Sequence, residues 1–411
     1  MAPPPDDRGG EGPGGLNRAA FQVAVIGTGP AGLMAAEVLA QAGAAVAVYD
    51  HMPSPARKLL MAGRGGLNLT HAEPLDSFLA RYGSARPRLE PAIRAFPPQA
   101  LRDWADGLGA ESFVGSSGRV FPRALKASPL LRAWLARLAG LGVVLHPRQR
   151  WLGFTASGAL RFSGAEVRPD ATILALGGAS WPRLGSDGTW PALLPGCAVA
   201  PLRPANMGFR VGWSPQMAAQ AGQPLKRIAA RFGATTLRGE AMLTATGIEG
   251  GVLYALSAAL REALAAHGPQ TLWLDLRPDL DEAALAQRLG GGATSISGRL
   301  RRAGLAPPAV ALVQEALHAG AARDNLAALV KAVPVAVQAA QPLARAISAA
   351  GGLAWGEVDA RFMLHRHPGV FACGEMLDWE APTGGYLLQA CFATGVAAAQ
   401  GALAWLAQPG E

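Results

Sequence analysis

The chain has 411 residues, half of them hydrophobic, which is enough to bury more than one core and favours two or three domains. Its three cysteines are widely spaced, which excludes a disulfide framework and a CxxC redox pair. Residues 1–20 are rich in Pro, Gly and charge, and predict a disordered tail rather than a signal peptide. The longest uncharged stretches are interrupted by Gly, Pro, Thr and Gln, so we expect a cytoplasmic protein with no membrane partner.

The positive charge admits two interpretations. The formal net charge is +8, and a basic surface could bind nucleic acid through its phosphates. However, only four of the 37 basic residues are lysines, and such an excess of Arg beside abundant Ala, Gly and Pro is typical of a compositional bias. Arg-rich stretches at 226–231 and 299–302 lack interleaved aromatic residues that could stack on bases.

The first predicted elements are a strand, a turn, a helix and a second strand between residues 21 and 50. The turn contains Gly27, Gly29, Pro30, Ala31 and Gly32. Gly27 permits a tight turn, Gly29 lets the backbone approach a pyrophosphate, and Gly32 allows close packing of helix and strand. The segment therefore predicts a dinucleotide-binding βαβ unit whose helix N-terminus faces the phosphates.

Asp50 ends the second strand, 23 positions after Gly27, where a carboxylate can accept hydrogen bonds from an adenosine ribose.

Two later segments favour FAD over NAD. Residues 171–180 form a buried strand that runs into Gly177, and residues 369–375 form another that ends in Gly374 and Glu375. Glu375 would bind the ribityl chain, and a helix that starts near Tyr386 would point its positive end at the flavin.

These stretches resemble the HI0933-like (YhiN/BaiN-type) flavoprotein family, within the wider glutathione-reductase-like FAD superfamily. The likeness is carried by residues 57–71, 177–188, 239–260 and 351–395. It implies that Trp151 offers its backbone to the adenine and that a further set of residues lies along the flavin: Arg57, Lys58, Asn68, Gly384, Gly385 and Tyr386. Where the family commonly has a cysteine, this chain has Leu67, which puts any role of a thiol there in doubt.

The predicted fold class is α/β, with a Rossmann-like, glutathione-reductase-type FAD-binding domain formed by residues 21–198 and 341–411. Residues 199–276 contain short apolar runs between Gly and Pro and predict a β-rich insert. Residues 277–340 are rich in Ala and Leu and predict a helical insert. The resemblance implies that both inserts cap the flavin and form the substrate cleft.

Reduction of an activated C=C bond needs a hydride from flavin N5 and an acid that protonates the neighbouring carbon. Tyr386, His71 and Cys391 are the candidate acids, and each is also a plausible packing or capping residue. A second GxGxxG motif does not follow, so NAD(P)H is expected to bind transiently as electron donor. We expect no metal.

Three functions remain open at this point: a reductase of C=C bonds in a small molecule, an RNA-modifying flavoenzyme that reduces uracil to dihydrouracil, and a non-catalytic flavin-binding or sensing protein. An RNA substrate would require basic residues along one rim of the flavin cleft, and the candidates are Arg227, Arg231, Arg299, Arg301 and Arg302. It would also require a stacking platform, for which the candidates are Trp181, Trp213 and Trp379.

Overall fold

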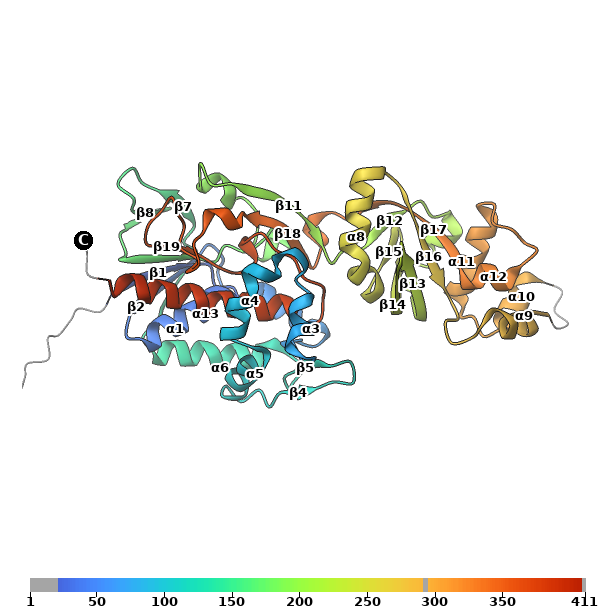
Figure 1. Ribbon diagram of the computed structural model, residues 1–411, viewed down its shortest axis with the longest axis horizontal. Coiled ribbons are helices and arrows are strands. Elements are labelled where there is room, and N and C mark those ends of the chain that lie inside the picture. The colour runs from blue at the N-terminus through green and yellow to red at the C-terminus, as the bar shows by residue number, and fades with distance from the viewer. Residues whose placement is uncertain (1–20, 291–294, 409–411) are drawn as a thin grey trace, which may run out of the picture.

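Two separate hydrophobic cores divide the chain. The computed structural model describes residues 21–290 and 295–408, and the predicted disordered tail, residues 1–20, lies outside the described residues. One core joins residues from the first 200 positions to residues after 350, whereas the other is built from residues between 207 and 346. Figure 1 shows the two corresponding lobes side by side along the long axis of the molecule.

The first lobe is built on a parallel sheet with the strand order β19-β10-β1-β2-β6. Its central strand reads QVAVI and is buried over its last four residues, as expected for a parallel strand covered on both faces. The carboxyl ends of β1, β10 and β19 lie at one edge, where doubly wound sheets bind their ligands. The strands are β1 (Gln22–Ile26), β2 (Ala45–Asp50), β6 (Val144–Pro147), β10 (Ala171–Leu174) and β19 (Val370–Ala372).

Two helices from opposite ends of the sequence pack together on this sheet: α1 (Pro30–Gln41) and α13 (Tyr386–Leu406). They approach closely because the Cβ of any other residue at Gly395 would lie 2.4 Å from the carbonyl oxygen of Ala31. By length and composition α13 could cross a bilayer, but 61% of its apolar window is buried inside the protein. It is therefore the core helix of this lobe.

The remaining elements of the first lobe surround the sheet. A three-stranded sheet, β3-β5-β4, and another, β7-β8-β9, flank it together with five helices. The strands are β3 (Thr70–His71), β4 (Phe113–Val114), β5 (Arg119–Phe121), β7 (Trp151–Phe154), β8 (Leu160–Phe162) and β9 (Glu166–Val167). The helices are α2 (Arg57–Ala62), α3 (Leu75–Ala80), α4 (Arg86–Ala95), α5 (Pro98–Asp106) and α6 (Ala127–Gly140).

The second lobe is a closed six-stranded barrel with one helix on the side that faces the first lobe and further helices at its far end (Figure 1). Its strands are β12 (Phe209–Val211), β13 (Pro224–Phe232), β14 (Thr235–Thr244), β15 (Gly247–Glu249), β16 (Gln270–Asp275) and β17 (Val333–Ala340). Its helices are α7 (Pro215–Ala218), α8 (Gly251–His267), α9 (Glu282–Gly290), α10 (Ile296–Arg302), α11 (Pro307–His318) and α12 (Leu326–Lys331). An antiparallel pair, β11 (Val199–Ala205) and β18 (Ser348–Leu353), runs between the lobes.

One difference from the sequence analysis concerns residues 333–340, which were expected within the helical stretch 277–340. They form β17, which pairs with both β12 and β16 and closes the barrel. Its inward residues Val333, Val335 and Val337 are buried in strict alternation. The β-branched residues and the period of two favour a strand there, although Ala-rich neighbours favour a helix.

Candidate cofactor and active site

The turn between β1 and α1 leaves a space that a phosphate can enter. A Cβ at Gly27 would lie 2.2 Å from the carbonyl oxygen of Ala175, and one at Gly32 would lie 2.0 Å from that of Gly27. These two glycines are therefore required by the fold. A Cβ at Gly29 would meet no described protein atom within 4 Å. Gly29 thus faces open space at the N-terminus of α1, which starts at Pro30 and attracts anions through its free N–H groups.

Asp50 is held at the carboxyl end of β2 by two backbone donors and one side-chain donor. Its Oδ2 accepts hydrogen bonds from the Thr28 amide, at 3.0 Å, and from the Thr28 hydroxyl, and its Oδ1 accepts one from the Met52 amide at 2.8 Å. A carboxylate offers about four lone-pair directions. The geometry therefore leaves acceptor capacity for ribose hydroxyls.

Helix α2 and the loop that follows it bring the next predicted residues to the same edge of the sheet. The Lys58 ammonium lies 3.0 Å from Oε2 of Glu375, although the two residues are 317 positions apart. Arg57 donates from Nη1 to the Ser54 hydroxyl at 3.2 Å. Leu67, at the place of the family cysteine, is fully buried, so this chain has a packing residue where a thiol would stand.

Buried polar atoms without a partner provide a test of whether the site fits a ligand. In the part of the chain that the structure describes, four buried side-chain atoms lack a hydrogen-bond partner: Arg57 Nε, Asn68 Oδ1, Trp151 Nε1 and Thr244 Oγ1. The first three belong to residues that the sequence analysis assigned to FAD. Because buried polar groups are normally hydrogen-bonded, unpaired ones indicate a missing partner. The donor and acceptor set fits a polar cofactor, and at Trp151 the unpaired atom belongs to the indole rather than to the backbone.

The segment after β19 closes the site from the other end of the sequence. Gly374 has a φ of 78°, and its amide donates to the Thr394 hydroxyl of α13 at 3.0 Å. Glu375 accepts from the Ala349 amide at 3.0 Å in addition to its contact with Lys58. Gly177 also has a positive φ, of 71°, and the Ser186 hydroxyl occupies the place that its side chain would take.

The start of α13 is formed by two glycines with positive φ, 138° at Gly384 and 97° at Gly385. A Cβ at Gly385 would lie 2.5 Å from the backbone of Thr70 in β3, so the helix begins directly against that strand. Because Gly385 occupies the cap position and has no side chain, the first N–H groups of α13 stay available for a ligand.

The Tyr386 hydroxyl donates to Oε1 of Glu73 at 2.5 Å, and Arg81 binds the same carboxylate with two nitrogens, at 3.2 and 2.8 Å. Burial, followed by the contact with Glu73, raises the pKa of Tyr386 well above its usual value. Burial also opposes ionisation of Glu73, but hydrogen bonds from Arg81 and Tyr386 outweigh it and lower the pKa of that carboxyl. Sequence reasoning missed Glu73 and Arg81, which lie more than 300 positions from Tyr386 and in no recognisable motif.

The other two candidate acids are engaged in different ways. His71 stacks on the Tyr386 ring, with centroids 5.6 Å apart. One ring nitrogen of His71 lies 3.0 Å from the carbonyl oxygen of Ser117, and the other accepts from the Glu73 amide at 3.1 Å. Cys391 lies beside the Glu375–Lys58 pair, and burial, followed by the charge of Glu375, raises the pKa of its thiol to about 12. The structure thus gathers all three candidates at the start of α13, with Tyr386 bound to an ionised carboxylate.

The candidate stacking residues differ in exposure. Trp213 donates to the carbonyl oxygen of Gly247, and Trp379, which is buried, donates to that of Gly374, so both act as packing anchors. Trp181 is 37% exposed and has a left-handed backbone, with a φ of 53°.

The basic residues Arg299, Arg301 and Arg302 lie on α10, at the end of the barrel lobe that points away from the first lobe (Figure 1). Arg227 and Arg231 lie on β13.

We find no candidate metal site in the described residues. Within residues 21–290 and 295–408, no group of three or more His, Cys, Asp and Glu residues could hold a metal ion.

A parallel sheet, an open glycine turn and a closing Gly-Glu pair together define a Rossmann-type FAD-binding protein. The model of the HI0933-like protein Rossmann domain matches residues 21–401, and the chain belongs to this family. It is an FAD-dependent oxidoreductase.

A curated relative, the 3-dehydro-bile acid delta(4,6)-reductase of Clostridium scindens, is 26% identical and covers 93% of this chain and 98% of its own length. Among solved structures, the 3-ketosteroid-delta4-(5alpha)-dehydrogenase of Rhodococcus jostii has a TM-score of 0.48 and 15% identity, and covers 96% of this chain and 98% of its own. A flavocytochrome c3 fumarate reductase has a TM-score of 0.48 and 13% identity, covering 95% and 79%. Because both TM-scores are below 0.5, these two structures are not evidence for the reaction of this protein.

Proposed function

We propose that this protein reduces an activated C=C bond in a small, apolar molecule, with electrons derived from NAD(P)H. The observation that carries the proposal is the Tyr386–Glu73–Arg81 array at the start of α13, in which the Tyr386 phenol is buried. The name of the bile acid reductase from Clostridium scindens supports the same reaction class. The proposal also takes Glu375, Lys58, Arg57 and Asn68 as the residues that line the flavin.

FAD, when bound, supplies a hydride to one alkene carbon, and the protein must deliver a proton to the other. Tyr386 is the proposed donor, because its raised pKa keeps the phenol protonated throughout the physiological range. Glu73 accepts a hydrogen bond from that phenol and holds its orientation, and Arg81 in turn fixes the carboxylate. Rotation of the phenol away from Glu73 would present its proton to the substrate.

The proposal places an apolar wall for the substrate on the segments that contact Glu375. Trp181 and Ile347 are large apolar side chains that are 37% and 42% exposed. The Ser180 hydroxyl, adjacent to Trp181, donates to the carbonyl oxygen of Ile347 at 3.3 Å, which ties the two segments together. Two positions after Ile347, the Ala349 amide binds Glu375. A flat ring system could stack on this surface.

NAD(P)H is proposed to bind transiently. The second lobe is a barrel with helices, whereas a dedicated nicotinamide domain would be a second parallel sheet with its own glycine turn. Slow reduction of the flavin without a stable nicotinamide complex would follow, and tight saturable binding of NADPH in a stopped-flow titration would contradict this part of the proposal.

The direct test is anaerobic reoxidation of the reduced protein. Conjugated 3-ketosteroids should restore the oxidised flavin absorbance, and uridine-containing RNA should not. Reoxidation by RNA alone would support the alternative RNA-modifying activity instead, and reoxidation by dioxygen alone would favour a protein that only binds flavin.

The Tyr386→Phe variant tests the proton donor. We expect reoxidation by the steroid to slow by about 100-fold, the usual size of general acid catalysis, while FAD affinity is unchanged. Tyr82→Phe is the matched control, because the buried Tyr82 hydroxyl donates to the backbone of Tyr386 and not to Glu73. Equal rates in the two variants would exclude Tyr386 as the donor.

A further inference from the structure

The junction between the two lobes is organised around one buried asparagine. Asn206 follows β11, where the chain enters the barrel lobe, and is 2% exposed. Its φ of 51° is left-handed, a conformation that asparagine tolerates better than most residues. Its amide N–H donates to the Ser257 hydroxyl of α8 at 3.1 Å, and its carbonyl oxygen accepts from the Ile347 amide at 3.2 Å. The backbone is thereby bound to α8 of the barrel lobe and to the segment that leads into β18.

The Asn206 side chain binds the loop that leads into α13. Nδ2 donates to the Ser348 hydroxyl and to the carbonyl oxygen of Ala381, both at 2.8 Å, and Oδ1 accepts from the Thr383 amide at 3.0 Å. A side chain must donate and accept at the same time to make these contacts. An aspartate of the same shape could still accept from Thr383 but would face the carbonyl oxygen of Ala381 without a proton.

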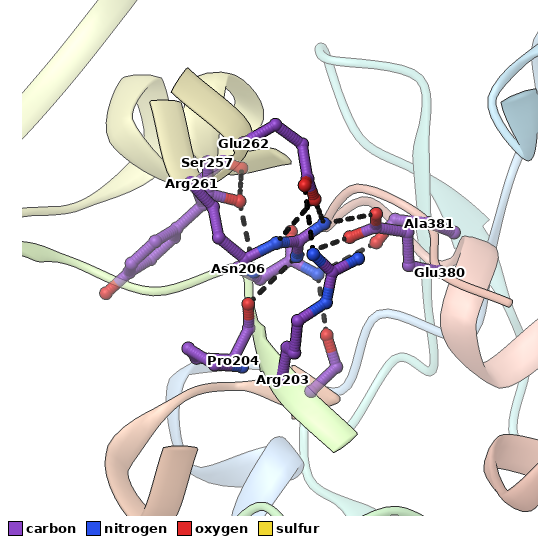
Figure 2. Close-up of polar contacts among 10 residues, drawn as sticks. Arg203, Pro204, Asn206, Ser257, Arg261, Glu262, Glu380 and Ala381 are labelled. Carbon is purple, nitrogen blue, oxygen red and sulfur yellow. Dashed lines mark hydrogen bonds and ion pairs between the residues drawn. The ribbon is translucent and has the colours of Figure 1, made fainter. Parts of the chain in front are cut away.

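An ion pair between a buried arginine and a partly exposed glutamate holds the beginning of the same loop. Arg261 of α8 is 6% exposed and binds the Glu380 carboxylate through two nitrogens, at 3.0 and 2.7 Å, and it also donates to the carbonyl oxygen of Pro204 at 2.9 Å. Glu262 accepts from Arg261 and from the exposed Arg203. Figure 2 shows these side chains converging from α8, β11 and the Glu380–Ala381 segment.

Only Gly384 and Gly385 separate the loop fixed in this way from Tyr386, the first residue of α13. Thr383 is followed at once by Gly384 and Gly385, and Gly385 packs against the backbone of Thr70. The start of α13 is therefore in contact with β3 on one side and is joined to residues 380–383 on the other. A displacement of residues 380–383 would move the first N–H groups of the helix.

We propose that Asn206 and the Arg261–Glu380 pair are positioning residues that transmit the placement of the barrel lobe to the flavin-facing end of α13. The barrel lobe then tunes the electrostatics of the cofactor. This inference requires FAD to lie at the start of α13 and is independent of which substrate is reduced.

The test uses the full-length protein and two measurements that do not depend on turnover. Hydrogen exchange of the apoprotein should accelerate in residues 380–388 of Asn206→Asp, with barrel strands β13 and β14 unchanged. In the FAD-loaded variant, the dissociation constant of sulfite should rise about fivefold, the size of one interaction of a charge with a helix terminus. Sulfite is suitable because it adds to flavin N5 and places negative charge on the pyrimidine ring.

Arg203→Gln is the matched control, because it removes the exposed contact of Arg203 with Glu262 and leaves the loop bonds intact. It should leave both measurements unchanged. Unchanged exchange in residues 380–388 or an unchanged sulfite dissociation constant in Asn206→Asp would overturn the proposal. If hydrogen exchange in Asn206→Asp is faster throughout the protein, the Glu380→Gln variant tests the proposal by the same two measurements. This substitution alters a single, partly exposed carboxylate. Steroid reduction could fail in the wild-type protein without affecting either result.

Discussion

Replacing Gly29 by leucine separates the needs of the fold from those of the cofactor. Backbone angles at Gly29 are φ −72° and ψ 176°, which any residue adopts, and a Cβ there meets no described protein atom within 4 Å. The free energy of unfolding of the apoprotein should therefore change by less than about 0.5 kcal/mol. A leucine would fill the space at the N-terminus of α1 and prevent the approach of the pyrophosphate.

The loss in FAD affinity follows from the contacts that the leucine would block. Two hydrogen bonds from backbone N–H groups to a charged phosphate are worth about 1.5–3 kcal/mol each, so the dissociation constant should rise by about 100-fold or more. Titration of apoprotein with FAD, followed by flavin fluorescence, measures this change. Gly164→Leu is the matched control, because its Cβ also faces open space but lies in an exposed loop between β8 and β9. Native FAD affinity in Gly29→Leu would refute the placement of the pyrophosphate.

Three further predictions test stability, pH dependence and substrate contact. Glu37 is buried and accepts hydrogen bonds from the Trp104 and Trp134 indoles and from Arg137. The Glu37→Leu variant should therefore lower the free energy of unfolding, measured in urea, by about 2–3 kcal/mol. A change below about 0.5 kcal/mol would show that this cluster adds little to stability. The pKa of Tyr386 is raised in the native state, so the unfolded chain loses this proton first and the free energy of unfolding falls as the pH rises above about 10. The Tyr386→Phe variant should reduce the slope of the free energy of unfolding against pH by about 1.4 kcal/mol per pH unit. An unchanged slope would contradict the raised pKa. Trp181→Ala should raise the KM for a steroid about tenfold with little change in FAD affinity, and an unchanged KM would remove Trp181 from the proposed substrate wall.

The nucleotide-binding unit could be predicted from sequence because its information is local. Gly27, Gly29 and Gly32 lie within six positions, and the strands on either side are continuous apolar runs. Backbone collisions now explain two of these glycines, and open space explains the third. The assignment of Arg57 and Asn68 came from family resemblance, and their unpaired buried atoms give it an independent physical basis.

Contacts between distant segments could not be predicted in the same way. Glu73 meets Tyr386 across 313 positions, and Asn206 meets Ala381 across 175, and neither pair leaves a periodic or spaced pattern in the sequence. Strand β17 was missed because its Ala-rich surroundings favour a helix, whereas the barrel needs a final strand between β12 and β16. In each case tertiary packing decides what local propensity leaves open.

A single-turnover measurement tests the central claim most directly. Protein loaded with reduced FAD is mixed without oxygen with one equivalent of a conjugated 3-ketosteroid, and the products are quantified by mass spectrometry. We predict one equivalent of steroid with a saturated C=C bond for each FAD oxidised, with the rate lowered in Tyr386→Phe. Oxidation of the flavin without a saturated product, or reduction of the ketone in place of the C=C bond, would contradict it.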